Sequence, residues 1–310
     1  MIEINKIDDK FFKKIIESKK NTRDFLKKVL PKGIKKHLDF SRIHIDRTNY
    51  VSNEFKEGYA DFTVKIKMKT KKGKKNPVDI YFIIEHKSKG EKELLLQILK
   101  YMYFVWEKDI LNKKPLRIII PVVFYHGKGK WKVPEAFVDQ FDVDEEIKKH
   151  LLNYRYILFD TNKWDLADES NKELIENVHL FSAMALMKAS FKKDLQIILD
   201  ILKLWHEKGF TRERRNMLFF LKYISQTQEI RFERLEKMLK ESKINGGDIM
   251  QTLAQQLREE GIKIGEEKGK EEKAKETAKK MLEKGFDLDT IVDVTGLHPS
   301  DIERLREVFS

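Results

Sequence analysis

A nearly continuous apolar run that ends in charged residues constrains this chain more than any other stretch of its sequence. The run is VDIYFIIEHK, residues 78–87. Central strands of a sheet that is covered on both faces have this composition, because both sets of alternating side chains are buried. The run ends in Glu85, His86 and Lys87. The sequence therefore places charged side chains directly beside the predicted core.

The segments around this strand predict an α/β fold. YADFTVKIKMKT (59–70) alternates apolar and polar residues as a strand with one wet face does, and KKGKKNP (71–77) has the composition of a turn. These segments predict a hairpin with the apolar run. The other predicted elements are a helix over 8–30, strands over 42–51, 116–127 and 154–161, a helix over 91–108, and helices over 170–244 with a break near Gly209. This order fits a mixed sheet of four or five strands with a crossover helix.

The charge of the chain is concentrated near its start. The whole sequence has a formal net charge of +12, and residues 1–100 alone carry 26 Lys and Arg against 14 Asp and Glu, which also gives +12. A localised basic surface attracts polyanions, because binding releases the counterions condensed on phosphates. Lysines that only solvate a surface give the same count, so charge alone leaves both interpretations open.

Composition excludes several classes of protein. The 310 residues include no cysteine, which rules out disulfides, thiolate zinc sites and cysteine nucleophiles. No window holds a long uncharged apolar run, and the N-terminal residues lack the apolar stretch of a signal peptide. We therefore expect a cytoplasmic protein that does not cross a membrane.

Three residues of the predicted hairpin could carry chemistry. Glu85 and Lys87 are two apart on a strand, so they point to the same face, and the paired strand can bring Asp61 beside them. Two carboxylates can hold Mg²⁺ through hard oxygen ligands, and a Lys ammonium can neutralise charge that develops on a phosphate. Taken singly, Asp61 could be a turn residue and Glu85 with Lys87 a surface ion pair. Their conjunction beside a buried run favours a metal-dependent phosphodiesterase site.

The ordered motif resembles that of a known superfamily. Asp61, Glu85 and Lys87 form D-(x23)-E-x-K, which resembles the PD-(D/E)XK phosphodiesterases, and Gln97 and Tyr101 resemble the Q-x-x-x-Y helix motif of RecB-type nucleases. Several longer stretches look like the Rpn family of recombination-promoting nucleases, whose members are also described as transposases. They are DDKFFKKI, GYADFTVKI, IYFIIEHKS, LLLQILKYM, PVVFYHGKGKW and the charged C-terminal segment that ends in TGL.

The resemblance implies roles for individual residues. Asp61 and Glu85 would be the metal ligands, Lys87 the catalytic lysine, and Gln97 a residue that positions substrate or metal-bound water, although Gln97 could also simply join the helix to the sheet. Asp9 matches the acidic position of the family's N-terminal motif, where it could be an accessory residue of the site, although a cap at the start of the helix is the favoured role. Asp8 stands where the family usually has His.

The remaining polar residues of this region admit structural roles. His86 alternates with its neighbours and should face the other way as a packed side chain, and His126 has no evident metal-binding spacing. Lysines alternate along one strand face and fill the predicted turn, where they form either a solvated edge or a patch that contacts nucleic-acid phosphates. Because they lie beside Asp61, the patch is the favoured interpretation. These are Lys65, Lys67 and Lys69 on the strand and Lys71, Lys72, Lys74 and Lys75 in the turn.

The C-terminal segment carries a separate signal. Gly261, Gly265 and Gly269 are four apart in a charged helix, and each costs about 1 kcal/mol of helix stability relative to Ala. They indicate either close approach of another helix or a frayed linker. We expect this segment to help form a homodimer. A small helix-turn-helix is predicted over 286–309, where net acidity favours contact with protein over DNA.

These observations predict three parts and one leading function. The parts are a PD-(D/E)XK nuclease-like domain over 1–165, a helical region over 166–247 and a charged helical tail over 248–310 that ends in a helical hairpin. The function implied by the resemblance is a Mg²⁺-dependent DNA endonuclease linked to recombination. The alternative is a catalytically inactive nucleic-acid-binding or protein-interaction scaffold on the same fold.

Overall fold

A five-stranded mixed sheet organises the first of two compact units, residues 1–246 and 247–310. The computed structural model describes residues 2–46, 62–69, 79–90, 93–228 and 230–307. The strands are β1 (Leu38–Asp46), β2 (Phe62–Met68), β3 (Asp79–Lys87), β4 (Ile118–Tyr125) and β5 (Ile157–Asp160), and they lie in that order across the sheet. β1, β2 and β3 pair antiparallel, whereas β3, β4 and β5 pair parallel. The predicted mixed sheet and its central strand are therefore confirmed.

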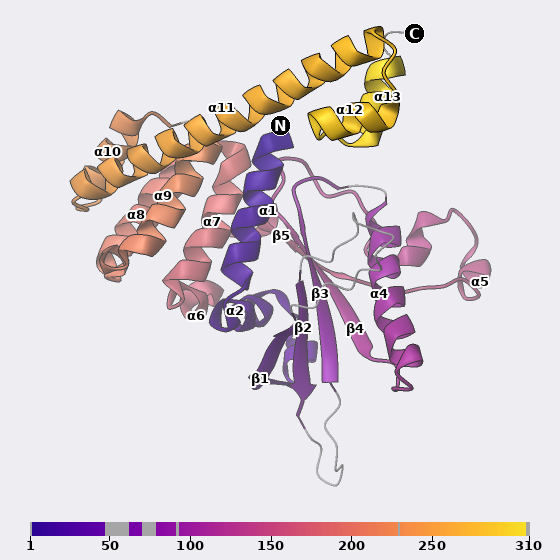
Figure 1. Cartoon of the computed structure of the whole chain (residues 1–310). Helices are drawn as coiled ribbons and strands as arrows, with labels where there is room; N and C mark the ends of the chain where they lie inside the picture. The colour runs from indigo at the N-terminus through magenta and orange to yellow at the C-terminus, as the bar shows by residue number, and fades with distance from the viewer. Residues whose placement is uncertain (1, 47–61, 70–78, 91–92, 229, 308–310) are drawn as a thin grey trace. The chain divides into compact units, whose positions relative to one another are not determined.

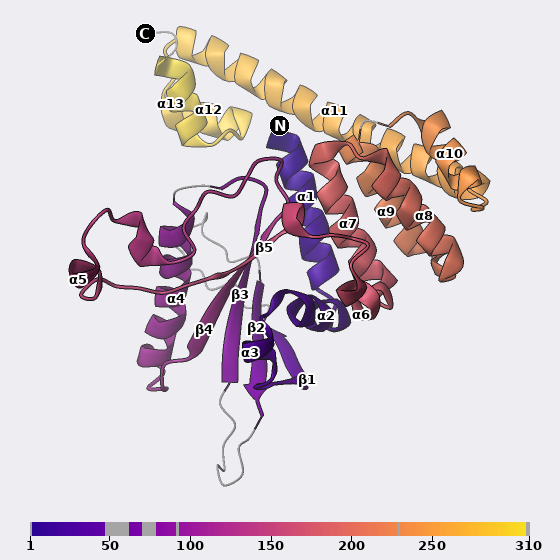
Figure 2. The same cartoon turned by 180° about the vertical axis from the view of Figure 1, so that it is seen from behind.

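Helices cover β3 on both faces. The crossover helix α4 (Leu94–Leu111) packs on one face, where Ile83 and Val123 join its apolar side chains in a single cluster. On the other face, Phe12 stacks on His86 and on Phe124 of β4. Figures 1 and 2 show α4 on one side of the sheet and α1 (Ile2–Ile16) with α2 (Lys19–Val29) on the other. Burial on both faces explains why the sequence of β3 is apolar almost without interruption.

The N-terminal segment forms two helices where the sequence predicts one over 8–30. The break falls at Ser18, whose hydroxyl oxygen accepts a hydrogen bond from the backbone N–H of Asn21, 3.4 Å away, and so caps α2. Asn21 donates from its side chain to the carbonyl of Ile15, and Thr22 donates to the carbonyl of Ile16. Side chains of α2 thus satisfy the last carbonyls of α1. Apolar spacing continues across the break, so periodicity alone misses it.

A helical layer follows the last strand. Its main helices are α6 (Lys172–Ile175), α7 (Val178–Lys192), α8 (Leu195–Glu207), α9 (Arg214–Gln228) and α10 (Phe232–Glu241). The predicted break is confirmed at Gly209, whose φ of 68° lies in the left-handed region that favours glycine. The shorter helices of this unit are α3 (Lys32–Lys35), η1 (Phe137–Gln140), α5 (Glu145–Lys148), η2 (Thr161–Lys163), η3 (Glu169–Asn171) and η4 (Phe210–Arg212).

The second unit is entirely helical over its described residues. A long polar helix, α11 (Gly247–Glu283), is followed by α12 (Leu288–Thr295) and α13 (Pro299–Glu307), as the sequence predicts. Ala278, Ile291 and Ile302 form a small buried core among these helices. None of the described helices is both long enough and apolar enough to cross a membrane.

The three spaced glycines of α11 have open space around them. A Cβ added at Gly261, Gly265 or Gly269 would meet no atom within 4 Å among the described residues. Ile262 and Ile264, between them, are exposed. The close approach that the spacing predicts is therefore not made within the described chain, and a homodimer through this segment stays a prediction.

Candidate functional site

Glu85 and Lys87 lie at the end of β3, on the face that α4 covers. Each faces a β4 residue in the parallel ladder, Glu85 opposite Val123 and Lys87 opposite Tyr125. Ile83, two residues earlier on the same face, belongs to the core under α4. Glu85 is only 2% exposed, so its carboxylate lies beside that core, as the sequence predicts.

Side chains of α4 complete this group. The Lys87 ammonium donates to Gln97 Oε1 at 2.9 Å and lies 4.0 Å from Glu85 Oε2. Gln97 in turn donates from Nε2 to the hydroxyl of Tyr101, 2.5 Å away. Gln97 and Tyr101 are four residues apart and so lie one turn apart on the same side of the helix. The structure thus brings together three of the four residues predicted for the catalytic site.

The fourth residue, Asp61, lies outside the described residues, as do Lys71, Lys72, Lys74 and Lys75. Phe62, which follows Asp61 in the sequence, pairs with Ile84, the residue before Glu85. The described ladder of β2 and β3 therefore ends beside the candidate carboxylate. The role of Asp61 stays a prediction.

The carboxylate of Glu85 is a suitable ligand for a hard divalent cation. Among the residues that the structure describes, no three His, Asp or Glu side chains are grouped so that they could hold a metal. Glu85 offers a buried carboxylate, which is the ligand type that Mg²⁺ takes in enzymes that act on phosphates. One or two carboxylates are enough for such a site, because water and substrate oxygens supply the remaining ligands. Glu85 with Asp61 would meet this requirement.

The opposite face of the same strand end carries a buried polar chain. His86 and His126 share a hydrogen bond of 2.6 Å between their Nε2 atoms, and the Asp8 carboxylate lies 3.9 Å from His126 Nε2. Tyr223 donates its hydroxyl to Asp8 Oδ1 at 2.5 Å. All four residues are buried. His86 therefore faces away from Glu85 as a packed side chain, as the sequence predicts.

Burial sets the protonation of this buried chain. It raises the pKa of Asp8 to about 7, although the hydrogen bond from Tyr223 acts in the other direction. Burial also lowers the pKa of His86 to about 3, with smaller contributions from the charges of Lys87 and Lys13. The pKa of His126 falls as well, again chiefly through burial. The two imidazoles are therefore neutral near pH 7.

Sequence reasoning did not find this buried chain. Tyr223 lies 215 residues from Asp8, and no local pattern links them. The only signal was the unusual carboxylate at Asp8. The helix-cap role expected for Asp9 is wrong, because α1 begins at Ile2 and Asp9 lies well inside it, paired with Lys13 at 2.9 Å.

The strand lysines do not form an edge. β2 lies between β1 and β3, so the solvated-edge interpretation of Lys65, Lys67 and Lys69 is wrong. The Lys65 ammonium lies 2.7 Å from the Asp79 carboxylate, and this bond raises the pKa of Lys65. Lys65 is thus engaged within the sheet.

Two family models match the chain. Residues 6–216, about two thirds of the chain, match the model described as "Putative transposase, YhgA-like". Residues 271–307 match the C-terminal helix-turn-helix domain of the Rpn/YhgA-like nuclease family. The second match covers α12, α13 and the end of α11, which supports the helix-turn-helix prediction for this end of the chain.

Full-length relatives are found among curated proteins of Escherichia coli K12. The recombination-promoting nuclease RpnA is 25% identical over 95% of both chains, and RpnC is 22% identical over 96% of both. RpnE, which is named an inactive recombination-promoting nuclease-like protein, is 24% identical over 95% of both. No solved structure matches the chain.

Proposed function

The chain belongs to the YhgA-like transposase family that includes the Rpn nucleases, and on this premise we propose that it is a metal-dependent DNA endonuclease linked to recombination. The observation that carries the proposal is the group at the end of β3. A carboxylate that is 2% exposed lies on the same face as a lysine that is held by a helix glutamine. Relatives named as recombination-promoting nucleases support the same class of activity.

Glu85 and Asp61 would hold the divalent cation of this site. When bound, such an ion polarises a phosphate and lowers the pKa of a bound water. The chain's own contribution is to hold Glu85 rigidly. β3 is hydrogen-bonded on both sides, and its next inward residue, Ile83, is fixed in the core. A rigid strand end keeps the carboxylate in one position, as catalysis by preorganised groups requires.

Lys87 would neutralise charge that develops on the phosphate. Its ammonium is held at 2.9 Å by Gln97 Oε1 and stands 4.0 Å from the Glu85 carboxylate. It is therefore placed beside the proposed metal position. Gln97 does not need to touch substrate for this role. It is a positioning residue that is itself held by the Tyr101 hydroxyl.

DNA is the proposed substrate for two reasons. Residues 271–307 match a helix-turn-helix domain, a motif that commonly places a helix in the major groove, and this family match outweighs the net acidity that pointed to a protein partner. The first hundred residues also carry the whole positive excess of the chain, and basic surfaces bind phosphate backbones.

A second candidate function rests on one comparison. RpnE matches over the same share of the chain as RpnA and is named inactive. Similarity over nearly the whole chain is therefore found both with relatives named as nucleases and with one named inactive. A nucleic-acid-binding protein without catalysis is thus the alternative.

Cleavage of supercoiled plasmid DNA separates the two functions. The native protein should nick or linearise plasmid with Mg²⁺ and not with EDTA, and Glu85→Gln should lose cleavage by at least about 100-fold, because it removes a ligand charge without changing shape. Glu107→Gln is the matched control, since Glu107 lies on α4 and accepts a hydrogen bond at 2.7 Å from the exposed Tyr103 hydroxyl. Equal cleavage by Glu85→Gln and the native protein would place the site elsewhere. No cleavage by the native protein would favour the binding function.

A further inference from the structure

A basic cleft lies between α2 and the segment that leads into α7, away from the α4 face of the sheet. It has a volume of about 620 Å³, and five cations line it: Lys20, Arg23, Lys27, Lys28 and Lys35. Four of them come from α2. Their spacing of three, four and one residues places them along the outer side of that helix, while Phe25 and Leu26 are buried beneath.

Two of the three carboxylates that line the cleft, Asp24 and Glu176, have partners other than its lysines. Asp24 accepts from Arg23 Nε at 2.9 Å and from Asn177 Nδ2 at 2.8 Å. Glu176 is held by Lys208 at 2.6 Å. Glu173 remains as an exposed acid at the rim. Neither Asp24 nor Glu176 therefore bonds to one of the four lysines of this cleft.

The four lysines have no acidic partner of their own. Over the described part of the chain, no carboxylate lies within 4 Å of the ammonium of Lys20, Lys27, Lys28 or Lys35. Lys28 donates to the Ser170 hydroxyl and Lys35 to the carbonyl of Lys27, both at 2.9 Å. Burial lowers the pKa of Lys28, Asp168 opposes this, and the like charge of Lys35 lowers it further. An anion between the two lysines would relieve their repulsion.

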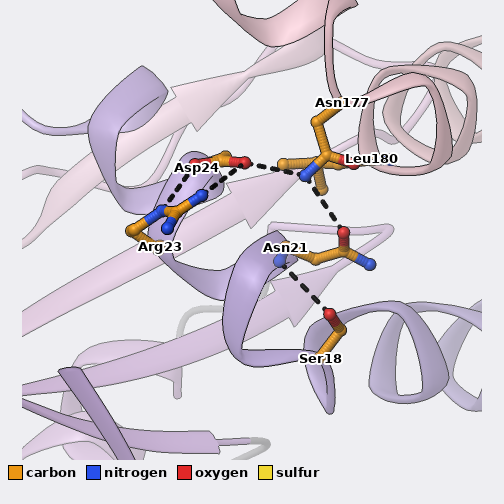
Figure 3. A network of polar contacts seen from close by, with 6 residues as sticks. All are labelled: Ser18, Asn21, Arg23, Asp24, Asn177 and Leu180. Carbon is orange, nitrogen blue, oxygen red and sulfur yellow. Dashed lines mark hydrogen bonds and ion pairs between the residues drawn. The ribbon is translucent and has the colours of Figure 1, made fainter. Parts of the chain in front are cut away.

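A polar network fixes the wall that carries these lysines. Asn177 caps α7 by accepting from the N–H of Leu180, and it donates to Asn21 Oδ1 at 3.1 Å and to Asp24. Figure 3 shows this network, with Arg23 turned onto Asp24 and Ser18 bonded to the N–H of Asn21. Asn21 and Asn177 are both buried. The cleft is therefore held open by fixed groups, and a ligand would not have to order its wall.

The row of cations is longer than one phosphate. Lys20 and Lys27 are seven residues apart, which is about 10 Å along a helix that rises 1.5 Å per residue. Phosphates advance about 3.4 Å per nucleotide along one strand of duplex DNA. The row therefore spans more than one phosphate of a chain. Among the described residues, no aromatic side chain lines the cleft, so it offers charge and no surface on which unpaired bases could stack.

We propose that this α2 cleft is a second DNA-binding site, which holds consecutive backbone phosphates of duplex DNA through Lys20, Lys27, Lys28 and Lys35. α2 packs on the face of the sheet opposite Glu85 and Lys87, through Phe25 against Phe124. The cleft therefore adds affinity without touching the reacting phosphate. Its phosphate chemistry follows from the cleft itself, whereas the choice of DNA rests on the proposed nuclease function.

The test compares two sets of four Lys→Gln substitutions in the full chain. The first set is Lys20, Lys27, Lys28 and Lys35. The matched control removes the same charge from four exposed lysines on α7, α8 and α10, which are Lys192, Lys203, Lys237 and Lys240. Affinity for a labelled duplex is measured by fluorescence anisotropy in EDTA, from 50 to 200 mM salt. Thermal unfolding checks that both variants are folded.

The cleft variant should show a salt slope that is smaller by about 3 to 4, at roughly 0.9 per lost phosphate contact. The native protein should then lose about 100-fold more affinity than the cleft variant across that salt range. The control should keep the native slope. Equal slopes for the two variants would overturn the proposal. A cleft variant that loses binding of inorganic tripolyphosphate but keeps the native slope for duplex DNA would overturn the assignment to DNA.

The outcome is separable from the cleavage test. Binding is read in EDTA, so it does not require an active site. Glu85→Gln should keep the native salt slope while losing cleavage, and the cleft variant should raise KM on a long duplex with kcat unchanged. A folded protein that cleaves no DNA yet shows the cleft effect would refute the nuclease proposal alone.

Discussion

The two faces of β3 differ in how far along the chain their partners lie. On the α4 face, Glu85, Lys87, Gln97 and Tyr101 fall within 17 consecutive positions and touch through a strand end and one helix turn. On the other face, His86 bonds to His126, which follows β4. His126 lies 3.9 Å from Asp8 of α1, and Asp8 accepts from Tyr223 of α9. Adjacent residues of one strand thus belong to a local group and to a long-range one.

The two groups should also differ in role, the local one in catalysis and the long-range one in the stability of the fold. The local group ends in Lys87, whose side chain is 14% exposed and whose ammonium lies 4.0 Å from the Glu85 carboxylate, so this group retains access to solvent. The long-range group is buried, and its polar contacts connect α1 and α9 to the sheet. We therefore expect substitutions on the α4 face to change turnover and substitutions on the opposite face to change folding.

Phe12→Ala should give the largest effect and should act on folding alone. Phe12 is 2% exposed and stacks on both His86 and Phe124. Its truncation leaves a cavity between α1 and the sheet and should lower the free energy of unfolding by about 4 kcal/mol. Urea titration followed by circular dichroism measures this loss. Phe104→Ala, on half-buried α4 surface, is the control and should lose much less.

Asp8→Asn should change how the free energy of unfolding depends on pH. Below pH 3.8 the Asp8 carboxyl is protonated in both folded and unfolded chains. Between about 4 and 7 the unfolded chain loses this proton while the folded chain keeps it, because the folded pKa is about 7. The unfolded state then binds fewer protons, so the stability contributed by protonated Asp8 falls as pH rises and is lost above about 7.

Asn cannot ionise, so its advantage over Asp8 should grow across that window, to on the order of 3 kcal/mol. Free energies of unfolding of both proteins at pH 4, 5.5, 7 and 8 measure the difference. His86 and His126 act in the opposite direction below pH 6.5, because their folded pKa values are lowered, but both proteins contain them and the difference removes their effect. A difference that does not change with pH would show that Asp8 is ionised in the folded protein. Asp9→Asn, at a half-exposed position, is the control.

Lys87→Ala, on the α4 face, should lower turnover and leave folding nearly unchanged. If its ammonium neutralises charge in the transition state, kcat should fall by about 100-fold, as loss of one preorganised group does. Affinity for uncleaved DNA and the unfolding midpoint should change little. Lys108→Ala, at an exposed position of α4, is the control. A large loss of affinity with unchanged kcat would make Lys87 a phosphate anchor instead.

The same contrast explains what the sequence could predict. The strands, the crossover helix and the pairing of Glu85 with Lys87 follow from period-two and helical spacing, which act over short stretches. Gln97 was added to this pair by the resemblance to the RecB-type helix motif, not by spacing. The break at Ser18 was missed because it depends on side chains of Asn21 and Thr22 that take carbonyls of α1. Tyr223 with Asp8 was missed because tertiary packing alone brings them together.

Gln97→Leu should give the smallest effect and decides what holds the local group in place. Leu keeps the helix propensity of Gln and occupies most of its volume, but it cannot accept from Lys87 or donate to Tyr101. Lys87 would then sample more positions, and kcat should fall by about 10-fold, which corresponds to roughly 1.4 kcal/mol. KM should stay near its native value, because the proposed role of Gln97 lies behind the reacting group. Gln97→Glu should restore part of kcat, since a carboxylate also accepts from the ammonium. If kcat is native in Gln97→Leu while the unfolding midpoint falls, Gln97 serves only to join α4 to the sheet.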